Sequence, residues 1–287
     1  MYRFMKEYSS KFSVERMANV FEVSRSGYYD WLNRAESKSA RERRLFDLEV
    51  KAAFAAGKGK YGRDRVRLEL GLRGRKASRK RVGTSMDRQG LRFKPKRRFR
   101  VTTNSKHNFP VAQNLLNRNF LTTGPNQVWV SDLTYLPSRN GWLYLTVFID
   151  LFSRMVVGWC VSSSLGHEGV LEALYRAIWR RRPPAGLMIH SDRGVQYCCE
   201  AFRKAIATHH FVQSMSRKGN CWDNAVSESF FGTLKNEWLP DIDIFDRVQA
   251  ERELFMYIEQ FYNGQRIHTT IGMPPIMFEN RKLIKCA

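Results

Sequence analysis

The sequence of 287 residues has few cysteines and no long hydrophobic run. Its five cysteines are an odd set without a Cys-x-x-Cys pair, which argues against both a disulfide framework and a zinc finger. No apolar run approaches the roughly 20 residues that span a bilayer. Charged and polar residues follow Met1 closely, so no signal peptide is recognisable, and we find no internal repeat. We therefore expect a folded, cytoplasmic protein without a membrane partner.

Acidic residues are scarce in the first third of the chain. Residues 1–110 contain 30 Lys and Arg against 11 Asp and Glu, a net charge of +19 within the total of +22. Residues 111–287 contain 19 Lys and Arg against 16 Asp and Glu, a net charge of +3. A basic arm joined to a nearly neutral remainder favours binding to a nucleic acid. A general solubilising charge and a ribosome-associated protein are the alternatives.

Two short helices are predicted within residues 13–34. Ser24 is suited to cap the second helix, and Arg25 lies near its start. Apolar residues recur at helical spacing in both helices: Val14, Met17, Ala18 and Phe21, then Tyr28, Trp31 and Leu32. The pair has the outline of a helix-turn-helix, so residues 1–40 are interpreted as a helix-turn-helix-like segment with Arg25 as a DNA contact. A plain helical hairpin is the alternative.

Residues 41–92 are interpreted as a second basic helical DNA-binding region. Residues 41–56 form its first predicted helix, a second begins at residues 61–63, and Ser78 caps a third that Gly90 ends. The apolar stripe expected on the first helix consists of Leu45, Leu48, Ala52 and Ala55.

Three cations, Arg79, Lys80 and Arg81, occupy the first turn of the third helix, where the helix dipole disfavours positive charge. DNA phosphates would neutralise them, although a solvated helix face is the alternative. Residues 93–125 are interpreted as a basic linker that follows a DNA backbone through Arg97 and Arg98. Each neutralised phosphate changes the slope of log affinity against log salt by about −0.9.

The remaining sequence predicts an α/β catalytic core over residues 126–240. Near-continuous apolar runs predict strands, and periodic segments predict helices between and after them. The expected strands span residues 127–136, 142–150, 155–161, 186–192 and 211–215, and the expected helices 167–182, 199–208 and 225–238. This order fits a ribonuclease-H-like mixed five-stranded sheet flanked by helices. In residues 241–287 we expect one amphipathic helix, 246–262, and an irregular tail.

The helix predicted over residues 225–238 presents one carboxylate. Val226, Phe230 and Leu234 fall on one face with Trp238 at its edge, while Glu228 points nearly the opposite way. Asn224, Lys235 and Gly232 lie around Glu228 on the helical wheel. A surface helix can produce this pattern by chance, so the interpretation depends on acids elsewhere in the chain.

Two aspartates upstream complete a constellation with Glu228. Asp132 lies inside a strand that should be central, Asp192 ends the fourth strand, and 35 residues separate Asp192 from Glu228. Converging carboxylates repel by about 4 kcal/mol at 4 Å and an effective dielectric of 20. A hard, oxygen-preferring cation would relieve this repulsion, and no Cys or His pair competes for it. We expect two Mg²⁺, which Mn²⁺ can replace, acting on a phosphodiester.

Several segments resemble a known family. The segments VWVSDLTYL, IDLFSRMVVGW, HSDRGVQY, GNCWDNAVSESFFGTLKNE and YIEQFYNGQRIHTTIGMPPIMFE are similar to the OrfB transposases of the insertion sequence 3 family, which are relatives of retroviral integrases. YYDWL and KYGRDRV extend the resemblance toward the N-terminus. Val195 stands where a small polar residue is more usual, and the tail after Gly272 is one residue short of the family pattern.

The resemblance implies a DDE transposase that cleaves DNA and transfers a 3′-hydroxyl end in a copy-out, paste-in reaction. Asp132, Asp192 and Glu228 would hold the metals, with Asp132 bridging both, and Lys235 would lie against the DNA. The implied partners are transposon-end and target DNA, further copies of the chain on that DNA, and an upstream-frame protein or fusion. Because the chain starts just before the helix pair, we expect it to be the downstream product alone. The implied location is bacterial cytoplasm, on the nucleoid when bound.

Three neighbours of the acids have open roles. His190 is either a substrate or supporting group or a core histidine. Arg193 and Asn224 either steer DNA phosphates or hold the loop. In the tail, Arg266 and His268 either reach a phosphate or pack on the core. The alternatives for the whole chain are a ribonuclease-H-like structure-selective nuclease and a non-catalytic, regulatory DNA-binding subunit.

Overall fold

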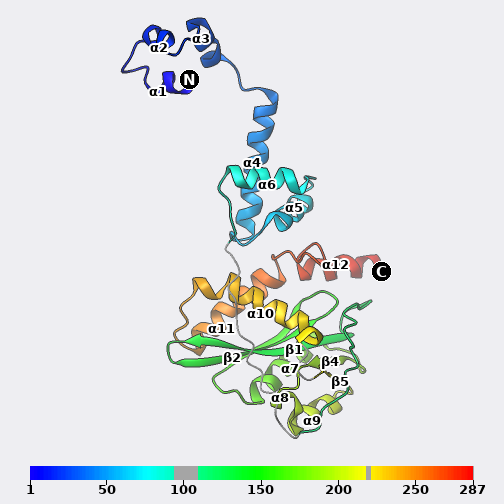
Figure 1. Cartoon of the computed structure of the whole chain (residues 1–287). Coiled ribbons are helices and arrows are strands. Elements are labelled where there is room, and N and C mark those ends of the chain that lie inside the picture. The colour runs from blue at the N-terminus through cyan, green and yellow to red at the C-terminus, as the bar shows by residue number, and fades with distance from the viewer. Residues whose placement is uncertain (94–108, 218–220, 287) are drawn as a thin grey trace. The chain divides into compact units, whose positions relative to one another are not determined.

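A computed structural model of the chain describes residues 1–93, 109–217 and 221–286 (Figure 1). Contacts between Cα atoms divide it into two units, Met1–Glu49 and Val50–Ala287. This division falls between residues 49 and 50, whereas the predicted segment boundaries lie at residues 40, 92, 125 and 240. Those boundaries stay predictions. The linker candidates Arg97 and Arg98 lie outside the described residues.

Three short helices form the first unit: α1 (Tyr2–Glu7), α2 (Val14–Val20) and α3 (Arg25–Asn33). The Oγ of Ser24 accepts a hydrogen bond from the Gly27 N–H at 3.0 Å and caps α3, as its sequence position predicted. The helices share a small core of Met5, Met17, Ala18 and Tyr28. The two helices predicted within residues 13–34 are confirmed, and α1 was not predicted.

Helix α4 (Lys38–Ala56) runs from the first unit into the second. Its predicted apolar stripe is wrong, because Leu45 is 46% exposed and Leu48 is 54% exposed. The buried face instead carries Phe46, Val50 and Ala53. These residues also recur at helical spacing, so periodicity alone allowed two faces, and tertiary packing selected the one with the aromatic ring.

Helices α5 (Arg63–Leu72) and α6 (Arg79–Arg88) follow, both at predicted positions. Gly62 precedes α5, and the Oγ of Ser78 caps α6 by accepting the Arg81 N–H at 3.2 Å. Four apolar side chains are buried on the two helices: Val66, Leu70, Val82 and Met86.

The second unit contains one five-stranded sheet in the order β3-β2-β1-β4-β5. Its strands are β1 (Val128–Ser138), β2 (Gly141–Asp150), β3 (Val156–Ser162), β4 (Met188–Ser191) and β5 (Val212–Met215). β1, β2 and β3 pair antiparallel, whereas β1, β4 and β5 are parallel. The predicted mixed sheet is confirmed, and β1 occupies its centre.

Helices cover both faces of the sheet, as predicted (Figure 1). Helices α7 (Glu168–Arg181), α8 (Val195–Cys198) and α9 (Glu200–Thr208) contribute to the core on one face. A Cβ at Gly158 in β3 would clash with Ala173 and Ala177, so this glycine allows α7 to approach the sheet. The other face carries α10 (Ala225–Glu237), α11 (Arg247–Phe255) and η3 (Met256–Asn263), a π-helical continuation of α11. Two short 3₁₀ turns, η1 (Cys221–Asn224) and η2 (Leu239–Asp241), flank α10.

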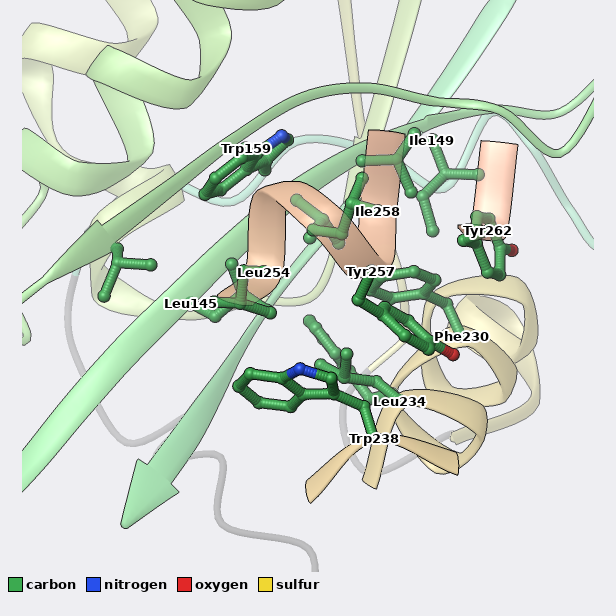
Figure 2. Close-up of a cluster of buried hydrophobic side chains, with 14 of the residues drawn as sticks. Leu145, Ile149, Trp159, Phe230, Leu234, Trp238, Leu254, Tyr257, Ile258 and Tyr262 are labelled. Atoms are coloured by element: carbon green, nitrogen blue, oxygen red, sulfur yellow. The ribbon is translucent and has the colours of Figure 1, made fainter. Parts of the chain in front are cut away.

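Figure 2 shows the core beneath α10 and α11. Leu145, Ile149 and Trp159 contribute from the strands. The helices supply Phe230, Leu234, Trp238, Leu254, Tyr257, Ile258 and Tyr262. Each fully buried side chain of this size contributes about 1.5–3 kcal/mol, so this cluster fixes α10 firmly on the sheet.

The predicted irregular tail is wrong, because the chain ends in helix α12 (Pro275–Cys286). Proline is well suited to the first helical position, since its missing N–H is not needed there and its φ is already helical. The pair Pro274-Pro275 therefore marks the start of a helix in this chain. Among the described residues, no helix is long and apolar enough to cross a membrane.

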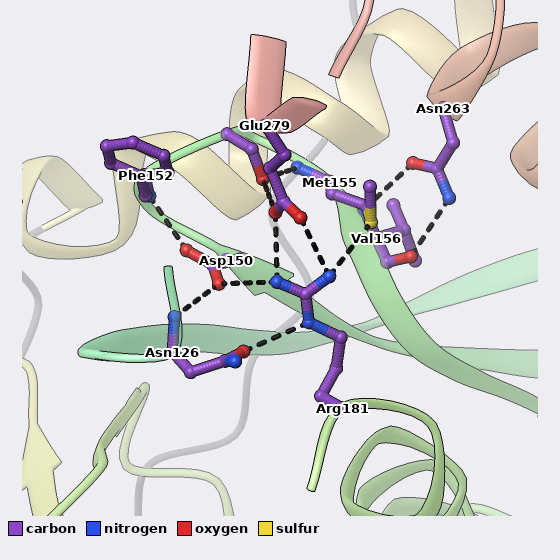
Figure 3. A network of polar contacts seen from close by, with 9 residues as sticks. Asn126, Asp150, Phe152, Met155, Val156, Arg181, Asn263 and Glu279 are labelled. Carbon is purple, nitrogen blue, oxygen red and sulfur yellow. Dashed lines mark hydrogen bonds and ion pairs between the residues drawn. The ribbon is translucent and has the colours of Figure 1, made fainter. Parts of the chain in front are cut away.

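A buried polar network attaches α12 to the sheet (Figure 3). The Arg181 guanidinium donates to both carboxylate oxygens of Glu279, at 2.8 and 3.0 Å. Glu279 also accepts the Ser153 hydroxyl at 2.6 Å. Asp150 accepts the main-chain N–H groups of Asn126 at 2.7 Å and Phe152 at 2.9 Å. This network therefore holds α12 against the ends of α7 and β2.

Burial of Asp150 raises its pKa to about 6, although the backbone donors oppose this effect. Because the folded-state pKa is the higher one, protonation stabilises the folded state, and this contribution is lost as pH rises from about 4 to 6. A pKa change from 3.8 to about 6 corresponds to about 3 kcal/mol. We expect the free energy of unfolding of wild type, relative to Asp150→Asn, to fall by up to about that amount between pH 4 and pH 7. Urea unfolding of both proteins measures it, and a pH-independent difference would contradict the assignment.

Candidate active site

Asp132 lies in the middle of the central strand, on the face that α10 covers. Side chains alternate along a strand, so Asp132 shares its face with Val130 and Leu136, which both belong to the core beneath α10. Its Oδ1 accepts the Leu133 N–H at 2.8 Å. The Asp132 carboxylate is therefore half-buried beside this apolar core.

Asp192 follows the last residue of β4, at the carboxyl end of a parallel strand. β1 and β4 pair with Val130 opposite His190, so two further residues along this register would place Asp192 beside Asp132. The Gly194 N–H donates to Asp192 Oδ1 at 2.9 Å and orients the carboxylate.

Glu228 is exposed on α10, whereas Phe230, Phe231 and Leu234 are buried. The predicted orientation of this helix is therefore confirmed, with Phe231 as an additional anchor. Apart from the adjacent residues and the backbone of α10 itself, no described atom lies within 4 Å of a Cβ built on Gly232, so the space beside this residue is open. An extended ligand can approach the helix there.

The three acids share one electrostatic environment. The pKa of Asp132 is raised well above its ordinary value, first by burial and then by the negative charges of Asp192 and Glu228. Burial also raises the pKa of Glu228. On the same helix, burial lowers the pKa of Lys235, and the charge of Asp132 opposes that change. The structure thus brings Asp132 within electrostatic reach of both other acids and of Lys235.

The donor set suits a hard divalent cation, because all three side chains offer carboxylate oxygens and Asp132 carries the cost of two nearby negative charges. The ligands are not closed around one point, however. Within residues 1–93, 109–217 and 221–286, no three His, Cys, Asp or Glu side chains are grouped so that they could hold an ion. Glu228 is exposed, so its side chain can change rotamer at low cost.

Tyr197 is a neighbour of the acids that the sequence interpretation missed. Its hydroxyl shares a 2.8 Å hydrogen bond with the Ser131 Oγ, one residue before Asp132, and both side chains are buried. Burial, then the charges of Asp132 and Asp192, raises the Tyr197 pKa well above its ordinary value, so the hydroxyl stays neutral. The sequence signal was its place in HSDRGVQY, five residues after Asp192.

The other predicted neighbours are all fixed to the main chain or the core. Asn224 is buried and donates from Nδ2 to the Ser131 carbonyl at 3.4 Å. Its Oδ1 has no hydrogen-bond partner in the described part of the chain. His190 is buried against Ser214 Oγ at 2.9 Å, and burial lowers its pKa to about 4. The burial of His190 favours its core role over a DNA contact. Arg193 donates to the Ser216 carbonyl at 2.7 Å.

The basic candidates of the N-terminal third are exposed. Arg25 pairs with Glu15 at 3.1 Å in the first unit, and Arg79 pairs with Asp64 at 2.9 Å in the second. Lys80 and Arg81 are also exposed in the first turn of α6. Exposed ion pairs of this kind are weak, so these side chains can exchange a carboxylate for a phosphate.

Arg266 does not face solvent. It is 1% exposed and donates to both carboxylate oxygens of Glu237, the last residue of α10, at 2.6 and 2.8 Å. Arg65 of α5 donates to the same carboxylate at 3.0 Å. Of the two roles considered for Arg266, the structure favours packing of the tail on the core.

Comparisons with known families match most of the chain. Residues 122–221 and residues 210–275 each match a family model described as an integrase core domain. Residues 40–99 match a model described as an HTH-like domain, so the match lies C-terminal to the helix pair for which we predicted that outline.

Relatives extend over nearly the whole length. The chain is 41% identical over 285 residues to the transposase InsF for insertion sequence IS3A of Escherichia coli (strain K12), covering 98% of this chain and 99% of the relative. It is 44% identical over 266 residues to the insertion element IS600 uncharacterized 31 kDa protein of Shigella sonnei, covering 92% and 98%.

Among solved structures, the simian T-cell lymphotropic virus intasome in complex with PP2A regulatory subunit B56 gamma has a TM-score of 0.48 and 18% identity. That match covers 74% of this chain and 70% of the other. The HTLV-2 integrase catalytic core domain in complex with magnesium has a TM-score of 0.44 and 19% identity, covering 55% and 99%.

Adding Mg²⁺ or Mn²⁺ should raise the melting temperature of the protein, because a bound cation offsets the repulsion between the acids. At a metal concentration of 100 times Kd, the stabilisation would be about 2.7 kcal/mol, equivalent to several degrees. Differential scanning fluorimetry measures this shift. The Asp132→Asn variant should lose most of it, whereas Asp243→Asn, which removes an exposed carboxylate paired with Arg139, should keep it. No shift of the wild type at millimolar metal would show that the acids do not meet.

Proposed function

We propose that this chain, which belongs to the insertion sequence 3 family of transposases, cuts DNA at the ends of its element and joins the freed 3′ ends to other phosphodiesters through Asp132, Asp192 and Glu228. Family membership follows from 41% identity over 98% of the chain, and the integrase core match covers both aspartates. The observation that carries the assignment of residues is electrostatic: Asp132, in the central strand, senses the charges of Asp192 and Glu228.

The acids would hold two Mg²⁺, with Mn²⁺ as a substitute and Asp132 as the ligand shared by both. Bound metal would activate the attacking oxygen and neutralise charge that develops on the phosphodiester. The rigid sheet holds Asp132 and Asp192 in place, since one lies within β1 and the other directly after β4. Glu228 supplies the third carboxylate from a helix whose opposite face is fully anchored.

The remaining side chains of the site would orient the DNA. Lys235 lies on α10 two turns beyond Glu228 and shares the electrostatic environment of Asp132, so its ammonium can hold a phosphate beside the acids. The open space at Gly232, between these two residues, leaves room for the DNA backbone. Tyr197 and Asn224 would act on Ser131 and so keep the main chain next to Asp132 in place.

The basic first third of the chain would hold the element ends. Its net charge supplies a general attraction to DNA, and Arg25, Arg79, Lys80, Arg81, Arg97 and Arg98 are the proposed contacts. Assembly of several copies on DNA, cooperation with an upstream-frame protein, and a location in the bacterial cytoplasm are parts of the same proposal.

Replacing Asp132 with Asn should abolish both cleavage and joining while leaving DNA binding intact. Metal ions supply several kcal/mol of transition-state stabilisation, and each 1.36 kcal/mol is a factor of ten, so we expect a loss of at least about a thousandfold. The assay incubates the chain with DNA of its element's ends and Mn²⁺ and resolves nicked from joined products on a denaturing gel. Asp243→Asn, an exposed acid on the turn before α11, is the matched control and should stay active.

Other outcomes of the same gel separate the alternatives. Strand transfer retained by Asp132→Asn would refute the assignment of this residue. Nicked products without joined ones from the wild type would indicate a nuclease of the same fold. Binding of element ends without any metal-dependent turnover would indicate a regulatory DNA-binding subunit.

A further inference from the structure

Asp223, the residue directly before Asn224, carries a heavily hydrogen-bonded carboxylate near the site. Its side chain is fully buried and accepts five hydrogen bonds. Arg217 contributes three of them, from N, Nε and Nη2 at 2.9, 3.0 and 2.9 Å. Arg118 Nε donates at 2.9 Å, and Asn114 Nδ2 donates at 2.9 Å. Two arginines from segments about 100 positions apart in the sequence therefore meet on one anion.

Both arginines still face solvent. The side chain of Arg118 is 45% exposed and that of Arg217 is 48% exposed, whereas the carboxylate between them is 0% exposed. One buried negative charge cannot neutralise two guanidinium groups, so the pair keeps a net charge of +1. Within the described residues, Arg118 Nη1 and Nη2 and Arg217 Nη1 donate to no other group. These donors are held in fixed directions and are available to an anion.

The pair is connected directly to the proposed catalytic acids. Asn224, which follows Asp223, donates to the Ser131 carbonyl next to Asp132. Ser216 precedes Arg217, and its main chain bonds to both neighbours of Asp192. The Ser216 N–H donates to the Ser191 carbonyl at 2.9 Å, and Arg193 Nε donates to the Ser216 carbonyl at 2.7 Å. The arginine pair thus lies at the carboxyl ends of β4 and β5, where the chain approaches both aspartates.

The segment that carries Arg118 is tied to the same edge of the sheet. The N–H groups of Leu115 and Leu116 both donate to the Ser214 Oγ in β5, at 3.0 and 3.2 Å. Arg118 itself has a φ of +61°, a left-handed conformation that is disfavoured for a residue with a side chain. The surrounding contacts therefore enforce this conformation, which directs the guanidinium toward Asp223.

We infer that Arg118 and Arg217, gathered by the buried carboxylate of Asp223, form a binding site for a DNA backbone phosphate beside the catalytic acids. The inference rests on the proposed function for the identity of the ligand. Guanidinium groups are suited to this task, because their planar forks donate two parallel hydrogen bonds to phosphate oxygens. Asp223 is a positioning residue: it limits the freedom of both side chains before DNA arrives and does not itself touch the DNA.

The salt dependence of DNA binding tests the site. Arg118→Gln and Arg217→Gln each leave one arginine on the carboxylate, so both variants should fold, which thermal melting checks. For each variant we expect the slope of log affinity against log salt, measured by fluorescence anisotropy on short duplex DNA between about 50 and 200 mM, to become shallower by about 0.9. The control is Arg247→Gln, since Arg247 is 49% exposed and pairs with a single carboxylate on α11. Unchanged slopes for both test variants, or an equal change in the control, would overturn the inference.

A second measurement starts from the wild-type chain, so its first result does not depend on the folding of a variant. Methylphosphonate groups, which carry no charge, are placed one at a time along the element-end duplex. One position near the scissile bond should weaken binding in wild type, and Arg118→Gln should lose this sensitivity at that position alone. A scan without any sensitive position near the scissile bond would overturn the inference.

Catalysis separates a failure of this site from a failure of the proposed function. Wild type that cuts and joins DNA while the arginine variants keep the full salt slope contradicts the phosphate site alone. If wild type never cuts DNA but the arginine variants have a shallower salt slope, the proposed function is contradicted and the phosphate site is supported. Asp223→Asn should make the salt slope shallower as the arginine variants do, because the guanidinium groups are no longer positioned, whereas a purely structural Asp223 would change the melting temperature and leave the slope intact.

Discussion

The packing of α10 against the central sheet is the interaction on which the proposed site depends. Phe230, Leu234 and Trp238 are buried in the core beneath this helix, so its opposite face, with Glu228, must point away from the sheet. Because the anchored side chains are large and apolar, rotation of the helix about its axis would expose all of them at once. The core therefore fixes the direction of Glu228, while the sheet fixes Asp132 and Asp192.

This arrangement concentrates charge at the carboxyl ends of the parallel strands. Burial and then the charges of Asp192 and Glu228 raise the pKa of Asp132. Cations lie on two sides of this region: Lys235 on α10, and Arg193, Arg118 and Arg217 at the edge of β4 and β5. In the proposed reaction a phosphodiester would bring negative charge toward the acids, so its binding would require both a metal between the carboxylates and fixed cations around them. Lys235 and the arginine pair are the side chains proposed for the second requirement.

Buried polar groups far from the acids serve a different purpose. Glu237 at the end of α10 receives Arg266 from the tail and Arg65 from α5, and Glu279 of α12 receives Arg181 from α7. Buried ion pairs of this kind add little net stability compared with apolar packing, but breaking one leaves an uncompensated charge. They determine which segments meet, so they fix the places of α5, α12 and the tail on the catalytic core.

The sequence by itself determined the order of strands and helices in the core and the outward direction of Glu228, because apolar runs and helical periodicity are local signals. It also named Asp132, Asp192 and Glu228 as the proposed site. Only the tertiary structure decided the buried face of α4, the helical tail that begins at Pro275, and the gathering of Arg118 and Arg217 on Asp223. Each of these depends on partners distant in the sequence or on a choice between two periodic faces. Spacing along the sequence gives the direction in which a side chain points, but which residue it contacts depends on how the whole chain folds.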